Sequence, residues 1–581
     1  MVRKKWKSGA ALMLSALMVL GMTGCGGDAE ESSQSAPEES RAEQQTESQE
    51  QADDAQTDQE QEADGELEVV KILGRNYTYT GANGRTVTLK DWSTEGKSKR
   101  WEKLEEDLAQ KGVKLELDLI EPDQFDTTLQ TMAASGELSN YDLINITSLD
   151  DKTKLNLVKQ GQLQPISDIL ENYSEGPYKE FAASDAGKFY EKRMRLEDGK
   201  IYWVTDFGVS SYGGVLGFQI RQDWLDVIGK ETPTTLDELF DTLKAFQDQD
   251  VNQNGEADEA VMVNYSSFST DISAWFGLGI DITFIDSTDG YTVKSPWYQE
   301  HVKDYIAYMQ KLYENGLLKM EDNQSGTYMA NNQVACISNW GSEQWLEPQI
   351  SVPEGAAYPW FVPFRIQAVE GQPALYRGSN TYNPGWTATA VPASSDKQEA
   401  IAKIFDYLVT EEAMWLTERG IEGVSYEMVD GVLTDTLDSS LENTDAVGMA
   451  LWCNGSIFPR YQMIEGGGPD EEASLTLAMA EANGVKNNQS GKGDFLLACL
   501  EEPEHKLFHD MNGLAVPTAE EIDRTNEIGT DLSTYSSELL TKLIMGEKSL
   551  DDWDSYMKDL QELGLDELIA INQARCDRAF K

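Results

Sequence analysis

Apolar and polar positions alternate with two different periods along most of the chain beyond residue 66. Residues 113–120 place an apolar side chain at almost every second position, which is the period of a half-buried β-strand. Residues 101–111 repeat apolar side chains at helical spacing, so that Trp101, Leu104 and Leu108 share one face. Because strand and helix patterns succeed each other, we expect βα units, a largely parallel sheet and an α/β fold. The other expected elements are strands at 68–73, 86–92 and 141–146, helices at 123–135, 235–246, 299–314, 397–410 and 549–580, and a helix–turn–helix at 157–170.

The first residues have a pattern of their own. Four basic residues precede an apolar run over residues 10–20, and this run is too short to span a bilayer core. This order indicates a signal peptide over residues 1–24. Its end, Met22-Thr23-Gly24-Cys25, resembles the lipobox of bacterial lipoproteins, which implies cleavage before Cys25 and a lipid anchor on that cysteine. The alternative is an ordinary secretory signal in which Cys25 is incidental.

Residues 25–66 are predicted to form a disordered acidic tether behind the lipidated Cys25. Glu, Gln, Asp, Ser and Ala dominate this stretch, and Arg41 is its one basic residue. Such a segment cannot bury enough apolar surface to offset the entropy of ordering. The mature protein is therefore expected to be a folded body held on a flexible leash outside the cell.

Charge and composition narrow the class of partner. The formal net charge is −55, and it becomes −59 when the four basic residues of the signal peptide are removed. So acidic a surface argues against binding to nucleic acid or to anionic lipid. Fourteen Trp and 23 Tyr are many for a soluble chain, and flat amphipathic rings suit sugar recognition.

Three common signatures of enzyme active sites are missing from the sequence. The sequence has no G-x-S-x-G elbow, no phosphate-binding loop and no G-x-G-x-x-G fingerprint.

Besides Cys25 there are four cysteines, which either form up to two disulfides or stay as buried thiols; they are Cys336, Cys453, Cys499 and Cys576.

Residues 250–259 carry the sharpest local signal for a metal. Oxygen-bearing side chains stand at positions 1, 3, 5 and 9 of this stretch, with glycine at position 6, as in the first part of an EF-hand loop. Position 12, which should be glutamate, is Val261, so the loop is not a true EF-hand. The alternative is a solvated turn after a helix. The predicted structural Ca²⁺ ligands here are Asp250, Asn252, Asn254, the Glu256 carbonyl and Asp258.

Four segments together resemble the extracellular solute-binding proteins of carbohydrate ABC importers, closest to the long lipoprotein branch that includes alginate-oligosaccharide binders. They are residues 199–207, 220–250, 385–412 and 553–580, and the resemblance runs from about residue 69 to the end. It implies a periplasmic-binding-protein-like type II fold, with two α/β lobes, a hinge and an interlobe ligand cleft. Lobe 1 would comprise 67–205 and about 386–445, and lobe 2 would comprise 206–385 and about 446–581. Similar calcium loops in the alginate-binding relatives use an acidic residue at position 10, which adds Glu259 to the metal ligands.

The resemblance places ligand-binding residues near the crossovers and on loops that follow strands. Rings would stack on sugar faces while charged groups take the hydroxyls or a uronate carboxylate. For each ring the alternative is a core position, and for the arginine a surface ion pair. The predicted ligand-binding residues are Trp203, Asp206, Trp275, Trp340, Trp345, Arg377 and Trp386, whereas Trp101, Trp415 and Trp553 are predicted to be core.

These observations predict an extracytoplasmic solute receptor at the outer face of the bacterial cytoplasmic membrane. It would capture an oligosaccharide by hinge closure and deliver it intact to the transmembrane subunits of an ABC permease. We expect it to act as a monomer, anchored to the membrane by lipid, with no catalytic residues. The alternative classes are a surface-anchored glycosidase or lyase, and a non-transport adhesin or sensor.

Overall fold

The computed structural model describes most of the chain from Leu67 onward, all of it within one compact unit, Ala63–Lys581. The described residues are 67–80, 86–94, 98–208, 215–259, 262–263, 271–279, 282–286, 289–320, 325–340, 350, 361–378, 387–418, 420–424, 426–429, 432–435, 457–459, 461–462, 499, 502–508 and 514–581.

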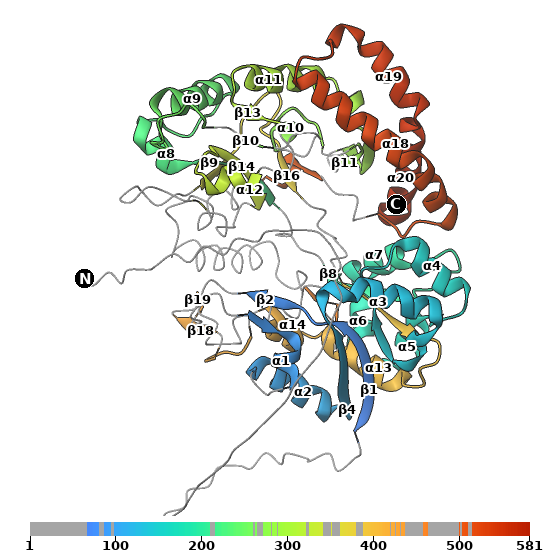
Figure 1. The fold of residues 1–581 in the computed structure, drawn as a ribbon. Coiled ribbons are helices and arrows are strands. Elements are labelled where there is room, and N and C mark those ends of the chain that lie inside the picture. Colours follow the sequence, from blue (N-terminus) through green and yellow to red (C-terminus); the bar gives the residue numbers. More distant parts are fainter. Residues whose placement is uncertain are drawn as a thin grey trace, which may run out of the picture. The chain divides into compact units, whose positions relative to one another are not determined.

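The first sheet is built around β1 (Glu68–Arg75), drawn in blue in Figure 1. This strand pairs in parallel with β4 (Val113–Ile120) on one side and β5 (Leu143–Asn145) on the other. Next to β5 lies β17 (Ala388–Pro392), which runs antiparallel and comes from much later in the chain. Two short strands, β6 (Leu163–Gln164) and β7 (Trp203–Thr205), pair with β17. The sheet is therefore completed only by a segment that returns after about residue 387.

The second sheet is centred on β9 (Val215–Arg221). β14 (Cys336–Trp340) pairs with it antiparallel, while β16 (Tyr376–Gly378) and β15 (Phe361–Phe364) pair with its first and second halves. Beyond β16 the order continues through three more strands, β21 (Lys506–Phe508), β11 (Phe284–Asp286) and β12 (Thr292–Lys294). Hence β21, which comes late in the sequence, lies between β11 and β16, which come much earlier.

Helices and small strand pairs complete the two sheets. With the first sheet occur α1 (Leu89–Thr94), α2 (Lys99–Gln110), α3 (Pro122–Ser135), α4 (Asp151–Lys159), α5 (Ile166–Tyr173), α6 (Pro177–Ala183), α7 (Asp185–Met194), α13 (Gln398–Leu408) and α14 (Glu411–Glu418). With the second occur α8 (Gln222–Ile228), α9 (Leu236–Gln249), α10 (Asp271–Trp275), α11 (Val302–Glu314), α12 (Ser325–Ala330), α18 (Ala519–Ile544), α19 (Trp553–Glu562) and α20 (Leu565–Phe580). The small pairs are β2 (Thr78–Thr80) with β3 (Thr86–Thr88), β10 (Met262–Val263) with β13 (Leu318–Lys319), β18 (Tyr426–Val429) with β19 (Val432–Asp435), and β8 (Phe207–Gly208) with β20 (Tyr461–Gln462).

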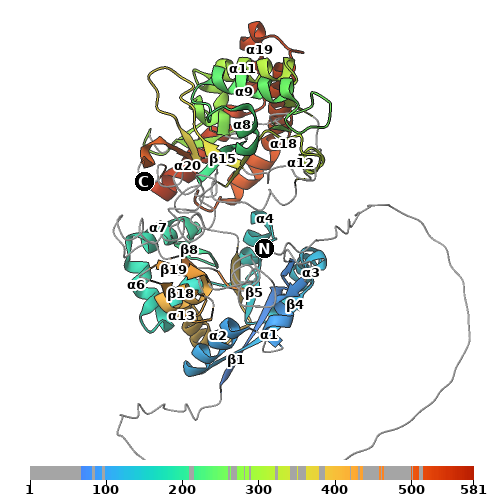
Figure 2. The same ribbon diagram turned by 90° about the vertical axis from the view of Figure 1, so that its left-hand side faces the viewer.

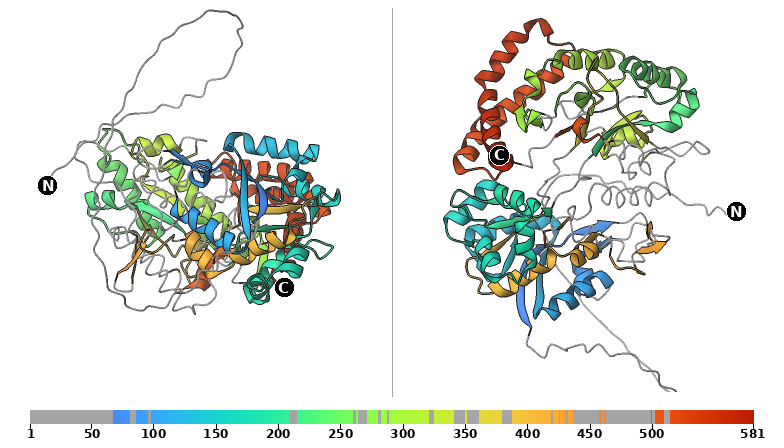
Figure 3. Two further views of the ribbon diagram at one scale, coloured as in Figure 1. Left: turned by 90° about the horizontal axis from the view of Figure 1, so that it is seen from below. Right: turned by 180° about the vertical axis from the view of Figure 1, so that it is seen from behind.

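Each sheet has its own hydrophobic core. In the first core, α13 buries all of its residues from Ala400 to Leu408 except Lys403, and it packs on α5. Figure 3 shows the ribbon from below and from behind. In the second core, α11 packs against the long helix α18, as Figure 2 shows. Burial of these apolar faces supplies most of the stability of the helices, since isolated helices of this length are marginal in water.

The last helices also contact helices that belong with the first sheet. α18 packs on α4, and α20 packs on α7. Phe580, near the end of α20, stacks on Tyr291 with centroids 4.2 Å apart and lies 5.1 Å from the Phe189 ring of α7. The C-terminal segment thus contributes to both cores, and Val516 donates its backbone N–H to the Arg193 carbonyl.

Most expected elements are confirmed, and three expectations need correction. The helix expected over 549–580 is divided into α19 and α20, because Gly564 between them takes the left-handed conformation with φ of 101°. The expected strand at 86–92 ends at Thr88, because Asp91 accepts hydrogen bonds from Thr88 and α1 begins at Leu89. Ile457 and Phe458, expected in the second lobe, are buried in the first core instead. Cys336, Cys499 and Cys576 are buried free thiols, while Cys453 lies outside the described residues. No helix in the described ranges is long and apolar enough to cross a bilayer.

Candidate functional site

Two of the predicted ligand residues come together on the second sheet. Trp340 in β14 and Arg377 in β16 are both register partners of Leu216 in β9, so they flank the same position of the central strand. The Arg377 side chain reaches across β9, and its Nη1 donates to Ser338 Oγ at 3.4 Å. Arg377 is buried, with 6% of its surface exposed. A buried guanidinium beside a hydroxyl provides planar donors that suit a carboxylate or vicinal sugar hydroxyls.

Asp206 directly follows β7 of the first sheet. It is buried, and it lies close enough to Tyr190 for its charge to help raise the pKa of that phenol, although burial of the ring is the larger cause. The Tyr190 hydroxyl accepts from the Thr205 N–H at 2.8 Å and donates to the Thr205 carbonyl at 3.2 Å. These bonds hold the end of β7, and with it the backbone that carries Asp206, against α7.

Two predicted ligand tryptophans occupy core positions. Trp203 is 3% exposed in the first core. Trp275 is 1% exposed in the second core, where its ring meets Phe218 edge-on at 5.3 Å and Phe364 at 5.6 Å. A ring enclosed in this way has no free face for a sugar, so the core alternative holds for both residues. Cys25, Trp345 and Trp386 lie outside the described residues.

The rings predicted to be core show graded burial. Trp101 is 2% exposed in the first core, which confirms that prediction. Trp553 is partly buried and packs against the second core, 5.8 Å from Trp297. Trp415 is partly buried in α14, with its indole N–H directed to Glu411 at 3.4 Å.

Residues 250–259, which we call the metal loop, begin where α9 ends. Thr235 caps the start of α9 by accepting from the Glu238 N–H, and Asp250 ends it in the left-handed conformation with φ of 44°. Gln253 and Gly255 also have positive φ, at 60° and 86°. Three left-handed residues within six positions fold the chain back sharply, and glycine is suited to the last of them because it carries no Cβ.

Side-chain oxygens in the metal loop organise its backbone. The Asp250 carboxylate accepts from the Asn254 and Gly255 N–H groups, both at 3.0 Å. Asn252 Oδ1 accepts from the Asn254 N–H at 3.1 Å, and Asn254 Oδ1 accepts from the Glu256 N–H at 2.8 Å. The first three predicted ligands thus direct side-chain oxygens to backbone N–H groups of the loop itself.

Asp258 and Glu259 supply the remaining carboxylates. Asp258 accepts from the side-chain amides of Asn252 and Asn254 at 2.9 Å. Glu259 is 1% exposed and its Oε1 accepts from the Asn252 N–H at 3.3 Å, whereas its Oε2 is buried with no hydrogen-bond partner in the described part of the chain. Burial raises the pKa of Glu259, and the charge of Asp258 adds to that rise.

Two residues that sequence reasoning missed hold the metal loop from outside. Gln247 Nε2, on α9, donates to the carbonyls of Glu259 and Gly316, both at 3.1 Å. Gln333 Nε2 donates to Asp258 Oδ2 at 2.5 Å from the turn that follows α12. No pattern near the loop signals Gln333, because it lies 75 residues away in sequence. Among the described residues, no group of three His, Cys, Asp or Glu side chains is gathered around one point, so a metal here would rely on asparagine and backbone oxygens too.

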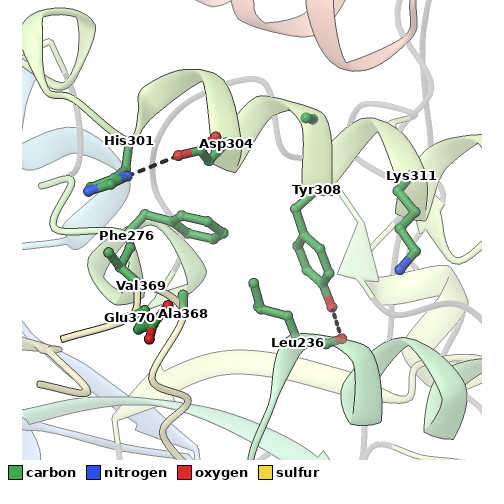
Figure 4. A pocket seen from close by; sticks show the side chains of 10 residues that line it. Leu236, Phe276, His301, Asp304, Tyr308, Lys311, Ala368, Val369 and Glu370 are labelled. Atoms are coloured by element: carbon green, nitrogen blue, oxygen red, sulfur yellow. Dashed lines mark hydrogen bonds and ion pairs between the residues drawn. The ribbon is translucent and has the colours of Figure 1, made fainter. Parts of the chain in front are cut away.

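A surface hollow of about 640 Å³ lies elsewhere on the second lobe, between α9, α11 and the segment that follows β15 (Figure 4). Phe276, Tyr308 and Val369 give it an apolar lining, and the Tyr308 hydroxyl donates to the Leu236 carbonyl at 3.0 Å. His301 and Asp304 form a 2.9 Å pair at its rim. None of the predicted ligand-binding or metal-binding residues lines this hollow.

Comparison with known proteins identifies relatives of the whole architecture. The profile of a family described as bacterial extracellular solute-binding protein matches residues 91–415. The fructooligosaccharide ABC transporter substrate-binding protein FusA of Streptococcus pneumoniae is 24% identical over 77% of this chain and 81% of its own. A structure of FusA, as an EF-hand mutant in complex with fructo-nystose, covers 88% of this chain and 99% of its own, with a TM-score of 0.57 and 18% identity.

Two further solved structures share the fold. A solute-binding protein of Bifidobacterium longum infantis, associated with an ABC transporter that binds human milk oligosaccharides (HMO), covers 89% of this chain and 100% of its own, with a TM-score of 0.62 and 19% identity. The alginate-binding protein AlgQ2, solved without calcium ion, covers 89% and 99%, with a TM-score of 0.56 and 18% identity. The fold is accordingly of the type II periplasmic-binding-protein kind, with two α/β lobes, and the relatives are binding proteins rather than enzymes.

Proposed function

The chain belongs to the family of bacterial extracellular solute-binding proteins, and from this premise we propose that it captures an oligosaccharide for an ABC importer. The observation that carries the proposal is the family match over residues 91–415, together with two sheets that each have a separate core. The named ligands of FusA and of the two other relatives are all carbohydrates, which favours the same ligand class here. Closure of the two lobes around the sugar would leave it chemically intact and present a closed form to the permease.

Within the cleft we propose that Arg377, Ser338 and Trp340 form the second-lobe wall. Asp206, which we expected to begin the second lobe, directly follows β7 of the first sheet and would contribute from there. The support is the shared register of Trp340 and Arg377 on β9 and the reach of Arg377 toward Ser338. Trp345 and Trp386 stay candidates for stacking on sugar faces. Trp203 and Trp275 are not part of this proposal because their rings fill the two cores.

A glycan panel tests the function directly. Purified protein is mixed with fructooligosaccharides, milk oligosaccharides and alginate oligosaccharides, and its melting temperature is measured with mass spectra of each sugar before and after incubation. We expect at least one glycan to raise the melting temperature and to be recovered unchanged. Shortened products would overturn the receptor in favour of a glycosidase or lyase, and no shift with any glycan would argue against an oligosaccharide ligand.

The Arg377→Met variant then tests the second-lobe wall. Loss of a charged hydrogen-bond donor should lower the affinity for the glycan found in the panel by about tenfold or more. Arg195→Met is the matched control, because Arg195 is a half-exposed arginine paired with Glu191 on α7. Equal affinities of both variants and the wild type would remove Arg377 from the site.

We further propose that the metal loop holds one structural Ca²⁺. Glu259 Oε2 supports this: it is buried and has no hydrogen-bond partner among the described residues, and a buried carboxylate oxygen without a donor is best stabilised by a cation. Asp250, Asn252, Asn254, Asp258, Glu259 and the Glu256 carbonyl would hold the ion, and a hard oxygen set suits Ca²⁺. At free Ca²⁺ ~100-fold above Kd, the ion would stabilise the fold by about 2.7 kcal/mol.

Calcium and a chelator separate this proposal from a simple turn. Added Ca²⁺ should raise the melting temperature of the wild type, and the Asp250→Ala, Asp258→Ala double variant should lose that rise. The double variant Asp185→Ala, Asp198→Ala, with two exposed carboxylates on the other lobe, should keep it. An identical melting temperature in calcium and chelator would refute the site.

We also propose that Cys25 carries the lipid anchor and that the protein acts as a monomer outside the cell. The lipobox-like residues before Cys25 support the anchor. A cell that expresses the protein should incorporate labelled palmitate into it, and Cys25→Ser should abolish the label and release the protein into the medium. Label that persists in Cys25→Ser would place the acyl chain elsewhere, and a dimer mass in light scattering would contradict the monomer.

A further inference from the structure

Gln333 connects the metal loop to a different part of the second lobe. It stands in the turn between α12 and β14, where its backbone N–H donates to the Tyr328 carbonyl at 2.9 Å. Its side-chain amide donates to Asp258 Oδ2. The backbone of Gln333 is therefore bonded to α12 and its side chain is bonded to the metal loop.

The neighbouring residue Asn332 extends this connection into the sheet. Asn332 is 5% exposed and takes the left-handed conformation, with φ of 59°. Its Oδ1 accepts from Arg221 Nη1 at 2.7 Å, and the Arg221 backbone N–H donates to the Ala335 carbonyl at 3.0 Å. Arg221 is the last residue of β9, so the turn is bonded both to the metal loop and to the central strand.

The Arg221 side chain is held rigidly in turn. Its Nε and Nη2 donate to the two carboxylate oxygens of Asp223 at 2.8 and 2.6 Å, and its guanidinium lies 4.2 Å from the Trp224 ring centroid. Arg221 is 1% exposed. A displacement of Asn332 would break a hydrogen bond to a buried charge, which has a high energetic cost. The turn and the end of β9 should consequently move together.

We propose that Gln333 positions Asp258 for the metal and that metal binding is transmitted through residues 332–333 to the β9–β14 pair, which carries the proposed second-lobe wall. The inference rests on the proposed Ca²⁺ site. Without the ion, the carboxylates of Asp250, Asp258 and Glu259 repel one another and the loop favours looser arrangements. With the ion, Asp258 is fixed, Gln333 is fixed through its amide, and β14 starts from a fixed turn.

The coupling is reciprocal by thermodynamic necessity. If Ca²⁺ orders β14, a ligand that contacts β14 loses less conformational entropy on binding, so Ca²⁺ raises the affinity for that ligand. The ligand must then raise the affinity for Ca²⁺ by the same factor. Removal of a group that hydrogen-bonds to a metal ligand commonly lowers the metal affinity by about 10-fold to 100-fold. We expect the lower end for Gln333→Ala, because the lost bond comes from a neutral amide.

Calorimetry and hydrogen–deuterium exchange with Ca²⁺ alone as the probe test this proposal. Gln333→Ala should bind Ca²⁺ about tenfold more weakly than the wild type, and Gln333→Met should behave alike, since it keeps the volume and loses the donor. Asn331→Ala, a change at an exposed residue of the same turn, is the matched control and should bind Ca²⁺ as the wild type does.

Exchange then locates the effect. In the wild type, Ca²⁺ should protect amides of residues 250–259 and also of 334–340. In Gln333→Ala at saturating Ca²⁺, protection of 250–259 should persist while protection of 334–340 is lost. Protection of both segments in Gln333→Ala, or an unchanged Ca²⁺ affinity, would overturn the inference and leave the Ca²⁺ site standing. Absence of Ca²⁺ binding to the wild type would instead refute the site itself.

Discussion

At the scale of single residues, burial decides which of the predicted side chains can act. Trp275 and Arg377 are both buried and both lie on or beside the second sheet, yet their surroundings differ. The rings of Phe218 and Phe364 contact Trp275 in the second core, whereas Arg377 reaches a hydroxyl on β14. The sequence could identify both residues as candidates, but it could not show which of them is a core residue. The rings that contact Trp275, those of Phe218 and Phe364, belong to strands far from it in the sequence.

Arg221 shows how costly a broken buried pair should be. Its side chain and that of Asp223 are 1% and 6% exposed, so Arg221→Met would leave a carboxylate buried without its partner. We expect a loss of about 3 kcal/mol in the free energy of unfolding, measured by urea titration. The double variant Arg221→Met, Asp223→Leu should recover a large part of that loss. Equal stabilities of the single and double variants would contradict this explanation.

At the scale of elements, strict periodicity predicted best. β4 has the predicted bounds because apolar and polar residues alternate from Val113 to Leu119, and Ile120 ends the strand. The strand expected at 86–92 was wrong because Leu89 and Trp92 fit a strand and a helix equally well. Thr88 caps the helix, since its Oγ1 accepts from the Asp91 N–H at 3.1 Å and the Asp91 carboxylate accepts in return from the Thr88 N–H at 3.3 Å. The Gln333 contact with the metal loop could not be foreseen, since it depends on how α9 and α12 pack.

The start of α18 should make the protein sensitive to acid. Thr518 and Glu521 form a capping box, and Arg578 of α20 donates two bonds to Glu521, at 2.8 and 2.7 Å. Burial opposes ionisation of Glu521, but these bonds outweigh it and hold its pKa below the usual 4.5. The stabilisation is therefore complete above about pH 4.5 and is lost as the pH falls through the lower pKa of the folded state.

Glu521→Gln tests that pH dependence. The variant should be less stable than the wild type by about 1 kcal/mol at neutral pH, because it lacks the charge that Arg578 faces. The difference should shrink as the pH falls below 4.5, which urea titrations at several pH values can measure. A difference of the same size at all pH values would mean that the ionised form of Glu521 is not what stabilises the cap.

At the scale of the whole molecule, the large excess of acidic over basic residues sets a general electrostatic penalty on the folded state. Salt should relieve it, because the Debye length falls from about 30 Å at ~0.01 M to about 8 Å at ~0.15 M. We expect the melting temperature to rise over that range of NaCl. A chelator must be present throughout, so that contaminating Ca²⁺ does not contribute. A falling melting temperature would show that attractive ion pairs outweigh the repulsion.

The late strands of the two sheets have a consequence for biogenesis. β17 completes the first sheet only when residues 388–392 have been made, and β21 enters the second sheet between β11 and β16 only after residues 506–508 have been made. The first sheet can therefore close only after about two thirds of the chain has been made, and the second sheet only after most of the chain has been made. A chain that carries the expected signal peptide would thus lack closed sheets during most of its synthesis, which favours export in the unfolded state.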